Sequence, residues 1–311
     1  MILTVCMSPC IDVNIDLDSL NVGKTNVLKS KEISLGGKAL NVAIGAKRLG
    51  SEVFSTGIMY EENGYVFKNA LNAEGVDFDF VWNKGRVREN YKFIDQRSML
   101  TEVNDVGEEV PKERLSEVVD KVRELSKKSA VTVISGGLPR FVNAKYYGEL
   151  VRAIAPNSLR IVDATGNKML AALKEGVDLI KPNAQELEST LGIKLTDKTS
   201  LIEGCKELIA LGAKRVLLSL GDKGAVITDG EKFYHCKSLN VAVNSTVGAG
   251  DAMVAAVALK MQKDSQLPDL LRAGVAAGTA RIVTQERISF SKEKYEEIYK
   301  KLKIKEISTD N

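Results

Sequence analysis

The segment STVGAGD, residues 245–251, has residue types that can hold and transfer a charged group. It lies between the β-type run NVAV and the apolar run DAMVAAVALKMQ, which predicts a turn that leads into a helix. Gly248 and Gly250 let the backbone curl so that several N–H groups point at one spot, and the helix adds its positive end. Asp251 can then accept a proton from an attacking hydroxyl group. Taken alone, the segment fits a glycine-rich turn with an aspartate N-cap better, so other segments must decide.

Five further polar motifs occur along the chain, and two of them have a clear chemical meaning. In GGKALNVA, two glycines allow a close approach of the backbone to a ligand, and Lys38 and Asn41 share one helix face. In KPNAQE, Asn183 and Glu186 lie one helical turn apart, which suits Mg²⁺ because this ion keeps several of its waters. A helix start with a first-turn Glu is the alternative interpretation of that pair. The five motifs are SPCID at 8–12, GGKALNVA at 36–43, SGGLP at 135–139, KPNAQE at 181–186 and SLGDKGA at 219–225.

Together with STVGAGD, these motifs make the sequence resemble the PfkB/ribokinase family of carbohydrate kinases over essentially its whole length. The resemblance implies a ribokinase-like α/β fold: a central, mainly parallel sheet flanked by helices, with a small β-sheet lid. It also implies an ATP-dependent sugar-phosphate kinase that uses Mg²⁺. Asp251 is then the catalytic base, and the backbone of Gly248, Ala249 and Gly250 holds the phosphoryl group in transit.

The resemblance also assigns binding residues. The sugar-phosphate residues are Asp12, Lys24, Gly36, Gly37, Lys38, Asn41, Arg88, Asn90 and Ser135. The nucleotide residues are Lys181, Asn183, Ser219, Gly221, Gly224, Thr246 and Gly248, and the metal residues, acting through water, are Asn183 and Glu186. Departures from the family motifs reshape the expected sugar pocket at Ser8, Ala39 and Gly137. The segment 284–287 lacks a glycine often found there, which leaves the adenine-side contacts near 278–290 open.

Three features point to phosphorylated hexoses as substrates within this family. STVGAGD stands where many relatives have DTxGAGD, and RVRENYK at 86–92 resembles the lid strand T-R-x-N-x-K of the family's 1-phosphofructokinases. Lys24 matches a phosphate-contacting lysine of related phosphohexokinases, and Arg88 can hold a phosphate by two parallel hydrogen bonds. The expected reaction is the ATP-dependent phosphorylation of fructose 1-phosphate to fructose 1,6-bisphosphate. The alternatives are a tagatose-6-phosphate kinase and, from another class, a non-catalytic sugar-phosphate sensor.

The elements that position these motifs alternate between short β-type runs and long amphipathic helical stretches. This rhythm predicts a mainly parallel sheet with helices on both faces, and ligands then bind at the carboxyl ends of the strands. Two stretches, 13–33 and 86–103, have no room for a crossover helix, and we expect them to form the lid of a single domain spanning 1–311. Ordinary edge hairpins are the alternative. The expected strands of the main sheet are 2–6, 52–58, 130–134, 160–162, 179–180 and 215–218.

Composition narrows the class of protein further. Hydrophobic residues make up 44% of the 311 residues and charged residues 27%, with a net charge of +3, which is ordinary for a globular protein. No basic stripe predicts nucleic-acid binding, and no membrane span or secretory signal is evident, so we expect a cytoplasmic protein. The single His235 disfavours Ser-His-Asp and Cys-His chemistry, and the four cysteines are expected to be buried free thiols. Besides ATP and a phosphorylated ketohexose, the expected partner is a second copy, which would cover the lid edges.

Overall fold

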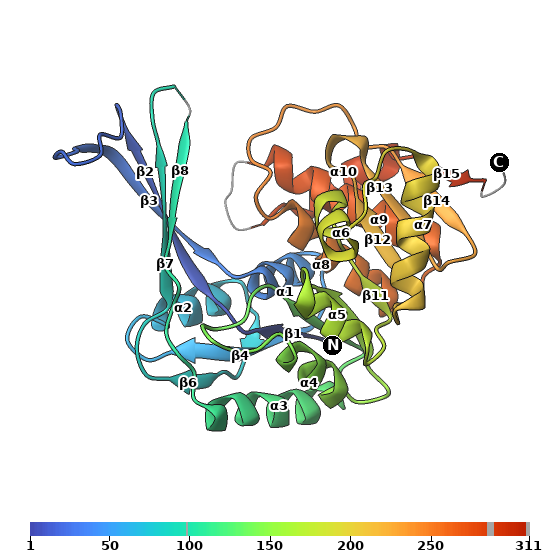
Figure 1. The fold of residues 1–311 in the computed structure, drawn as a ribbon, viewed down its shortest axis with the longest axis horizontal. Coiled ribbons are helices and arrows are strands. Elements are labelled where there is room, and N and C mark those ends of the chain that lie inside the picture. Colours follow the sequence, from blue (N-terminus) through green and yellow to red (C-terminus); the bar gives the residue numbers. More distant parts are fainter. Residues whose placement is uncertain (98, 285–288, 309–311) are drawn as a thin grey trace.

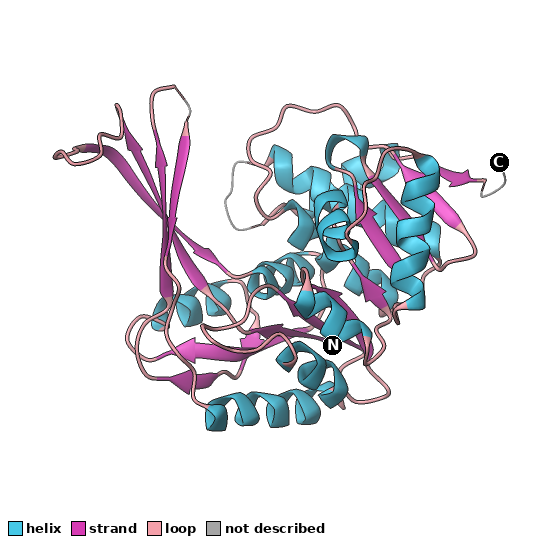
Figure 2. Ribbon diagram, viewed as in Figure 1, coloured by secondary structure: helices cyan, strands magenta, loops and turns pink. Residues whose placement is uncertain are grey.

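A computed structural model describes residues 1–97, 99–284 and 289–308 of the chain. Its main body is a large, mostly parallel sheet between layers of helices (Figures 1 and 2). The strands of this sheet are β1 (Ile2–Cys6), β4 (Val53–Tyr60), β5 (Asp77–Phe78), β6 (Val81–Asn83), β9 (Val131–Ser135), β10 (Leu159–Asp163), β11 (Leu179–Ile180), β12 (Val216–Ser219), β13 (Ala225–Thr228), β14 (Phe233–Cys236) and β15 (Ile304–Ile307).

The central strands pair in parallel, in the spatial order β12, β11, β10, β9, β1, β4 and β5, and β6 also pairs with β4. At one edge, β13, β14 and β15 extend the sheet by antiparallel pairing. Every residue of β1 and β9 is buried, because helices cover both faces of a parallel sheet, and the two strands are mostly apolar. The carboxyl ends of the parallel strands therefore meet at a single edge of the sheet.

Two layers of helices cover this sheet. One layer contains α1, α8, α9 and α10, which pack against one another and against strands from β1 to β15, and the other runs from α3 to α7. The helices are α1 (Lys38–Arg48), α2 (Tyr65–Ala73), α3 (Lys112–Ser126), α4 (Tyr146–Ala153), α5 (Asn167–Leu173), α6 (Ala184–Leu191), α7 (Lys198–Ala210), α8 (Ala249–Met261), α9 (Leu267–Val283) and α10 (Lys292–Lys301). In α8 most residues are buried, since the helix packs against α1, α9 and the sheet.

A smaller sheet of four strands projects away from the main body (Figure 1). Its strands, in spatial order, are β3 (Leu28–Gly36), β2 (Cys10–Leu17), β7 (Arg88–Ile94) and β8 (Leu100–Asn104). The pair β2 and β7 is parallel, and the two outer pairs are antiparallel. The sheet extends beyond the expected stretches 13–33 and 86–103, because β2 already begins at Cys10 and β3 continues to Gly36. Two of the polar motifs therefore form the base of this sheet.

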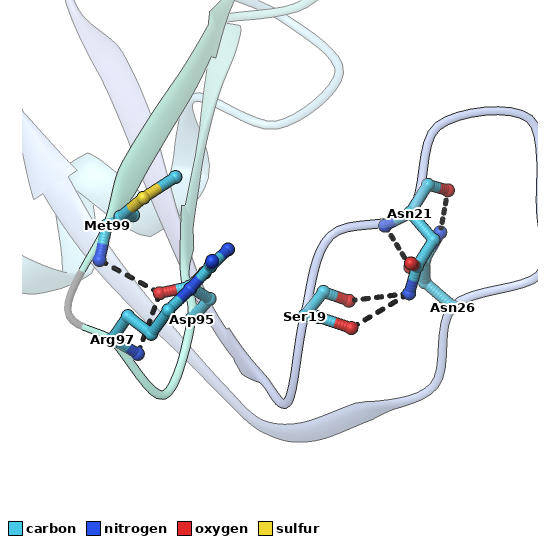
Figure 3. Close-up of polar contacts among 6 residues, drawn as sticks. All are labelled: Ser19, Asn21, Asn26, Asp95, Arg97 and Met99. Carbon is cyan, nitrogen blue, oxygen red and sulfur yellow. Dashed lines mark hydrogen bonds and ion pairs between the residues drawn. The ribbon is translucent and has the colours of Figure 1, made fainter.

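The far ends of the small sheet are turns held by local hydrogen bonds (Figure 3). In the turn between β2 and β3, Asn26 accepts a hydrogen bond from the N–H of Asn21 and donates one to its carbonyl oxygen. In the turn between β7 and β8, the carboxylate of Asp95 accepts hydrogen bonds from the N–H groups of Arg97 and Met99. Asn and Asp favour such turns because their side chains bind nearby backbone groups.

The expected parallel sheet with flanking helices and a small separate sheet is confirmed. Each expected strand lies within one or two residues of an observed one, whereas β13 to β15 were not predicted. The four cysteines are buried and unpaired, as expected. In the described ranges, no helix is long and apolar enough to cross a membrane.

Candidate active site

A cavity of about 610 Å³ lies where the carboxyl ends of the central strands meet the base of the small sheet. Asp163 ends β10 and Lys181 follows β11, so parallel pairing places both side chains at the same edge. The small sheet contributes Asp12 from β2 and Arg88 from β7, and the first turn of α8 contributes Asp251. Segments that are far apart in the sequence thus converge on one polar cavity.

The glycine-rich turn before α8 has the features of an anion-binding site at one end of this cavity. Gly248 is the N-cap of α8 and has a φ of 81°, in the left-handed region that glycine adopts without strain. The start of the helix turns backbone N–H groups and its positive end toward the cavity. Arg281 of α9 is buried next to this turn. Its Nε would lie 3.2 Å from a Cβ atom at position 248. The guanidinium group adds a second positive charge that the sequence motifs did not predict.

Asp251 is placed to act as a general base. It is buried and lines the cavity, and Nδ2 of Asn41 donates a hydrogen bond to its Oδ2 at 2.8 Å. Burial, followed by the nearby carboxylate of Asp163, raises the pKa of Asp251 to about 6, although the hydrogen bond from Asn41 lowers it. A carboxylate with this pKa is mostly ionised at neutral pH and still basic enough to take a proton. Asp251 therefore has the protonation state and the position that proton transfer requires.

Asp163 orders the lysines around the base. Its side chain is fully buried; Oδ1 lies 3.3 Å from Nζ of Lys181, and Oδ2 lies 3.6 Å from Nζ of Lys38. Ser135 donates a hydrogen bond to Oδ2 at 3.3 Å. Burial alone would raise the pKa of Asp163, but Lys181 and Lys38 lower it below its ordinary value. Asp163 thus stays ionised and holds two ammonium groups at the cavity.

The polar face of the small sheet forms the opposite wall. Asn90 links two of its residues, since Nδ2 donates to Oδ1 of Asp12 at 3.0 Å and Oδ1 accepts from Nη1 of Arg88 at 2.9 Å. Nζ of Lys92 lies 3.3 Å from Oδ2 of Asp12, and Nε of Arg88 donates a hydrogen bond to Oγ of Ser8 at 3.2 Å. This network fixes a carboxylate that can bind hydroxyl groups next to a guanidinium that can bind a phosphate.

A second cavity of about 940 Å³ opens into the first and shares Lys181, Asn183 and Gly250 with it. It lies between the turn after β12, the loop before α8 and one side of α9, and its lining combines polar backbone with apolar side chains such as Met253 and Val275. This size and mixed lining suit a small ligand with a flat apolar group and a polar tail. The tail would reach the first cavity at the glycine-rich turn.

Asn183 and Glu186 form a reciprocal cap at the start of α6. Oδ1 of Asn183 accepts from the N–H of Glu186 at 2.8 Å, and Oε2 of Glu186 accepts from the N–H of Asn183 at 2.9 Å. Both residues also line the first cavity. One carboxylate and one amide, each partly engaged by the backbone, fit Mg²⁺ held mainly through its waters and through phosphate oxygens. The sequence-based alternatives for this pair, helix cap and metal site, are therefore compatible.

The structure gathers most of the predicted residues around these two cavities. Those that line the first are Asp12, Gly36, Gly37, Lys38, Asn41, Arg88, Asn90, Lys181, Asn183, Glu186, Gly248, Gly250 and Asp251. Those that line the second are Lys181, Asn183, Ser219, Gly221, Gly224, Thr246, Ala249 and Gly250.

Two predicted sugar-phosphate residues lie elsewhere. Ser135 is buried behind Asp163, and Lys24 is exposed in the turn between β2 and β3 and lines neither cavity. Within the segment 278–290, for which the adenine-side contacts were left open, Gly278, Thr279 and Ile282 line the second cavity. Residues 285–288 lie outside the described part of the chain.

Sequence reasoning missed several cavity residues. Asp163 directly follows the predicted strand 160–162, so the rule that ligands bind at strand ends could have found it. Lys92 ends the segment RVRENYK that was compared with T-R-x-N-x-K, but it was given no role; it shares the face of Asn90 two residues earlier. Neither periodicity nor a motif pointed to Lys168 of α5, which lines the cavity, or to Arg281, which lies next to Gly248 without lining a cavity.

Comparison with known proteins identifies the class. The family model of the pfkB family carbohydrate kinases matches residues 3–294. The chain is 29% identical to tagatose-6-phosphate kinase of Staphylococcus epidermidis, over 99% of this chain and 100% of that protein. It is 30% identical to 1-phosphofructokinase of Xanthomonas campestris, over 92% of this chain and 94% of that protein. The crystal structure of phosphofructokinase-2 from Escherichia coli in complex with fructose-6-phosphate superposes with a TM-score of 0.87 at 27% identity, covering 96% of this chain and 98% of that one.

The family match and the fold thus define the class of the protein as a carbohydrate kinase. The chain belongs to the pfkB family of carbohydrate kinases and has its ribokinase-like fold. Kinases of this family use ATP as the phosphate donor, which fits the larger cavity and the anion-binding turn between the two cavities.

The raised pKa of Asp251 predicts how kcat/KM depends on pH. If this carboxylate is the base, kcat/KM should be flat at neutral pH and fall about tenfold per pH unit below about 6, because only the ionised form accepts a proton. Asn41→Ala removes a hydrogen bond that stabilises the ionised form, so the acid limb of its pH profile should move to higher pH.

The control for this measurement is Asn72→Ala, at an exposed position on α2. A phosphate monoester also titrates near pH 6, but that titration is the same for every variant, so only the shift between variants is diagnostic. An acid limb that stays in place in Asn41→Ala would contradict the assignment of Asp251.

Proposed function

We propose that this kinase phosphorylates fructose 1-phosphate to fructose 1,6-bisphosphate, that is, that it acts as a 1-phosphofructokinase. The observation that carries the proposal is the network on β7, in which Arg88 and Asp12 are joined through Asn90 at the wall of the cavity opposite the main sheet. A guanidinium in this position has a clear use when the acceptor already carries a phosphate, and little use for a neutral sugar. Asp12 lies beside it to bind ring hydroxyl groups.

The reaction follows from the order of the groups across the cavity. The phosphate of the acceptor binds Arg88, which places the far end of the sugar toward Asp251. Asp251 takes the proton of the C6 hydroxyl group as the hydroxyl oxygen attacks the γ-phosphorus of ATP. The bond between this phosphorus and the β,γ-bridging oxygen breaks, and ADP is the leaving group. Backbone N–H groups from Gly248 to Gly250, with Lys38 and Lys181, stabilise the charge on the phosphoryl group in transit.

The remaining cofactor and the small sheet complete the proposal. Mg²⁺, held near Asn183 and Glu186, neutralises charge on the phosphate oxygens of ATP when it is bound. The small sheet acts as a lid, because its polar face forms one wall of the cavity while the rest of it projects from the main body (Figure 1). Closure would keep out the water that otherwise hydrolyses ATP.

A tagatose-6-phosphate kinase is the second candidate, favoured by the full-length similarity to the Staphylococcus epidermidis enzyme. Both candidate substrates are ketohexose monophosphates, and both products are 1,6-bisphosphates. The candidates therefore share the phosphate clamp, the base and the donor pocket. They differ in which end of the sugar lies at Arg88, and a substrate panel separates them.

The proposal predicts the substrate preference and its dependence on Arg88. With saturating MgATP, the wild type should prefer fructose 1-phosphate to tagatose 6-phosphate and strongly to free fructose. Arg88→Ala should lower kcat/KM for the phosphorylated sugar by about 10–150-fold, because a charge-assisted hydrogen bond contributes about 1.5–3 kcal/mol. The same variant should change the rate with free fructose little, since free fructose has no phosphate for the guanidinium to bind.

The matched control is Arg86→Ala, two residues earlier, whose guanidinium is exposed and pairs with Glu62 and Glu89 outside the cavity. It should leave kcat/KM nearly unchanged for every sugar. Equal losses on fructose 1-phosphate and free fructose in Arg88→Ala would mean that Arg88 only shapes the sheet. A wild type that prefers tagatose 6-phosphate would replace the first candidate by the second.

The other face of the small sheet supports a homodimer as part of the proposal. Alternation along β2 points Asp12 into the cavity and Val13 to the opposite face. Pairing aligns Ile33, Val13, Tyr91 and Val103 in one row across the four strands. The two outer members of this row are 57% and 55% exposed. Val13 is buried and Tyr91 is half-buried, so the row is exposed at its two ends. An apolar row with exposed ends, on a sheet with two free edges, is covered well by the same surface of a second copy.

A charged residue in this row should separate the two copies. Ile33→Asp places a carboxylate in the proposed interface, so the mass from sedimentation equilibrium should fall from that of a dimer toward that of a monomer. Leu100→Asp is the matched control, because Leu100 is also 57% exposed but pairs with Ile94 on the cavity face. The dimer proposal is wrong if the wild type is a monomer or if both variants dissociate equally.

A further inference from the structure

Lys168, on the first turn of α5, has no role in the site as described so far. It is half-buried and lines the first cavity, together with Asp163 at the end of β10 and Asn183 at the start of α6. Within the described ranges, its ammonium group has no hydrogen bond or ion pair with another residue. Its charge is therefore not neutralised by the protein, in contrast to the charges of Lys38 and Lys181, which both pair with Asp163.

The electrostatic surroundings of Lys168 favour the binding of an anion. Burial, and then the positive charge of Lys38, lower the pKa of Lys168. Two like charges that face one cavity, one of them without a counterion, repel each other until an anionic ligand lies between them. The same charges disfavour a metal ion at that spot. The missing partner is thus negatively charged and comes from the substrates.

The position of Lys168 selects one of the anionic groups. The phosphate already on the acceptor is bound at the small sheet, where Arg88 lies. Lys168 instead interacts electrostatically with Lys38, which pairs with Asp163 as Lys181 does. Lys181 in turn lies next to the first turn of α8, because its Nζ is 3.1 Å from where a Cβ atom of residue 250 would be. Lys168 therefore belongs to the end of the cavity where donor and acceptor meet.

We propose that Lys168 is a further catalytic residue, a third cation beside Lys38 and Lys181 that contacts the phosphoryl group in transit. It binds the γ-phosphate of ATP before transfer, and the same phosphoryl group on the acceptor after transfer. ADP, which lacks this group, leaves Lys168 without its partner. The proposal rests on ATP-dependent phosphoryl transfer and holds whichever ketohexose phosphate is the acceptor.

Calorimetric binding of two nucleotides to the full-length enzyme tests the proposal. The probes are the non-hydrolysable β,γ-imido analogue of ATP and ADP, each with Mg²⁺. Lys168→Met keeps most of the length of the side chain and removes its charge, so affinity for the analogue should fall on the order of tenfold or more while affinity for ADP stays within about twofold. In turnover, kcat should fall with the affinity for the analogue, and Lys168→Arg should restore part of both.

The control is Lys174→Met, the same substitution at an exposed lysine directly after α5. It should change neither nucleotide affinity. The proposal is overturned if Lys168→Met weakens both nucleotides equally, weakens neither, or weakens only the binding of the sugar phosphate. A wild type that binds neither nucleotide would instead refute the kinase function itself, so the two failures can be told apart.

Discussion

The hydrogen bond between Asn41 and Asp251 joins residues that are 210 positions apart in the chain, and the site depends on it. It connects the first turn of α1 to the first turn of α8, two helices that pack against each other on one side of the sheet. The two helices meet because α1 packs on β1 and β9 while α8 packs on β9 and β10, and these three strands lie side by side in the sheet. Close packing around Asp251 also excludes water, which raises the pKa of this carboxylate.

The small sheet has two different faces because successive side chains along each strand point to opposite sides. One face carries Asp12, Asn90 and Lys92 and forms a wall of the cavity. The opposite face carries the apolar row that begins at Ile33 and ends at Val103. In the proposed function, the first face binds the substrate and the second binds another copy. A shift of one residue in the register would exchange the two faces, so both functions depend on the same pairing.

The parallel sheet and most of the cavity residues could be predicted from the sequence, and the reason is physical. Glycine turns and strand ends have local signals, and the parallel topology brings the strand ends to one edge, as with Lys181 and Asn183. The role of Asp163 was missed because an aspartate at a strand end has no motif of its own and acts through two lysines from distant segments. Arg281 was missed because it lies in an apolar helix, where no periodic pattern marks a buried charge.

Other parts were beyond sequence reasoning because tertiary pairing decides them. The strands β13, β14 and β15 extend the sheet in antiparallel fashion, and β15 comes from a C-terminal segment whose sequence is mainly charged. Lys24 was expected at the substrate because it matches a phosphate-contacting lysine of related kinases; in the structure it lies in the turn between β2 and β3 and lines neither cavity.

The most direct test of the central claim, that Asp251 is the base of a sugar-phosphate kinase, is a comparison of turnover and binding in Asp251→Asn at pH 8. The amide has nearly the same shape as the carboxylate but cannot accept the proton. The account predicts that kcat falls by roughly 10²–10⁴-fold, the usual contribution of a positioned general base, while the dissociation constants for ATP and the sugar phosphate stay within a few-fold of wild type. A variant that keeps more than about a tenth of the wild-type kcat would contradict the account.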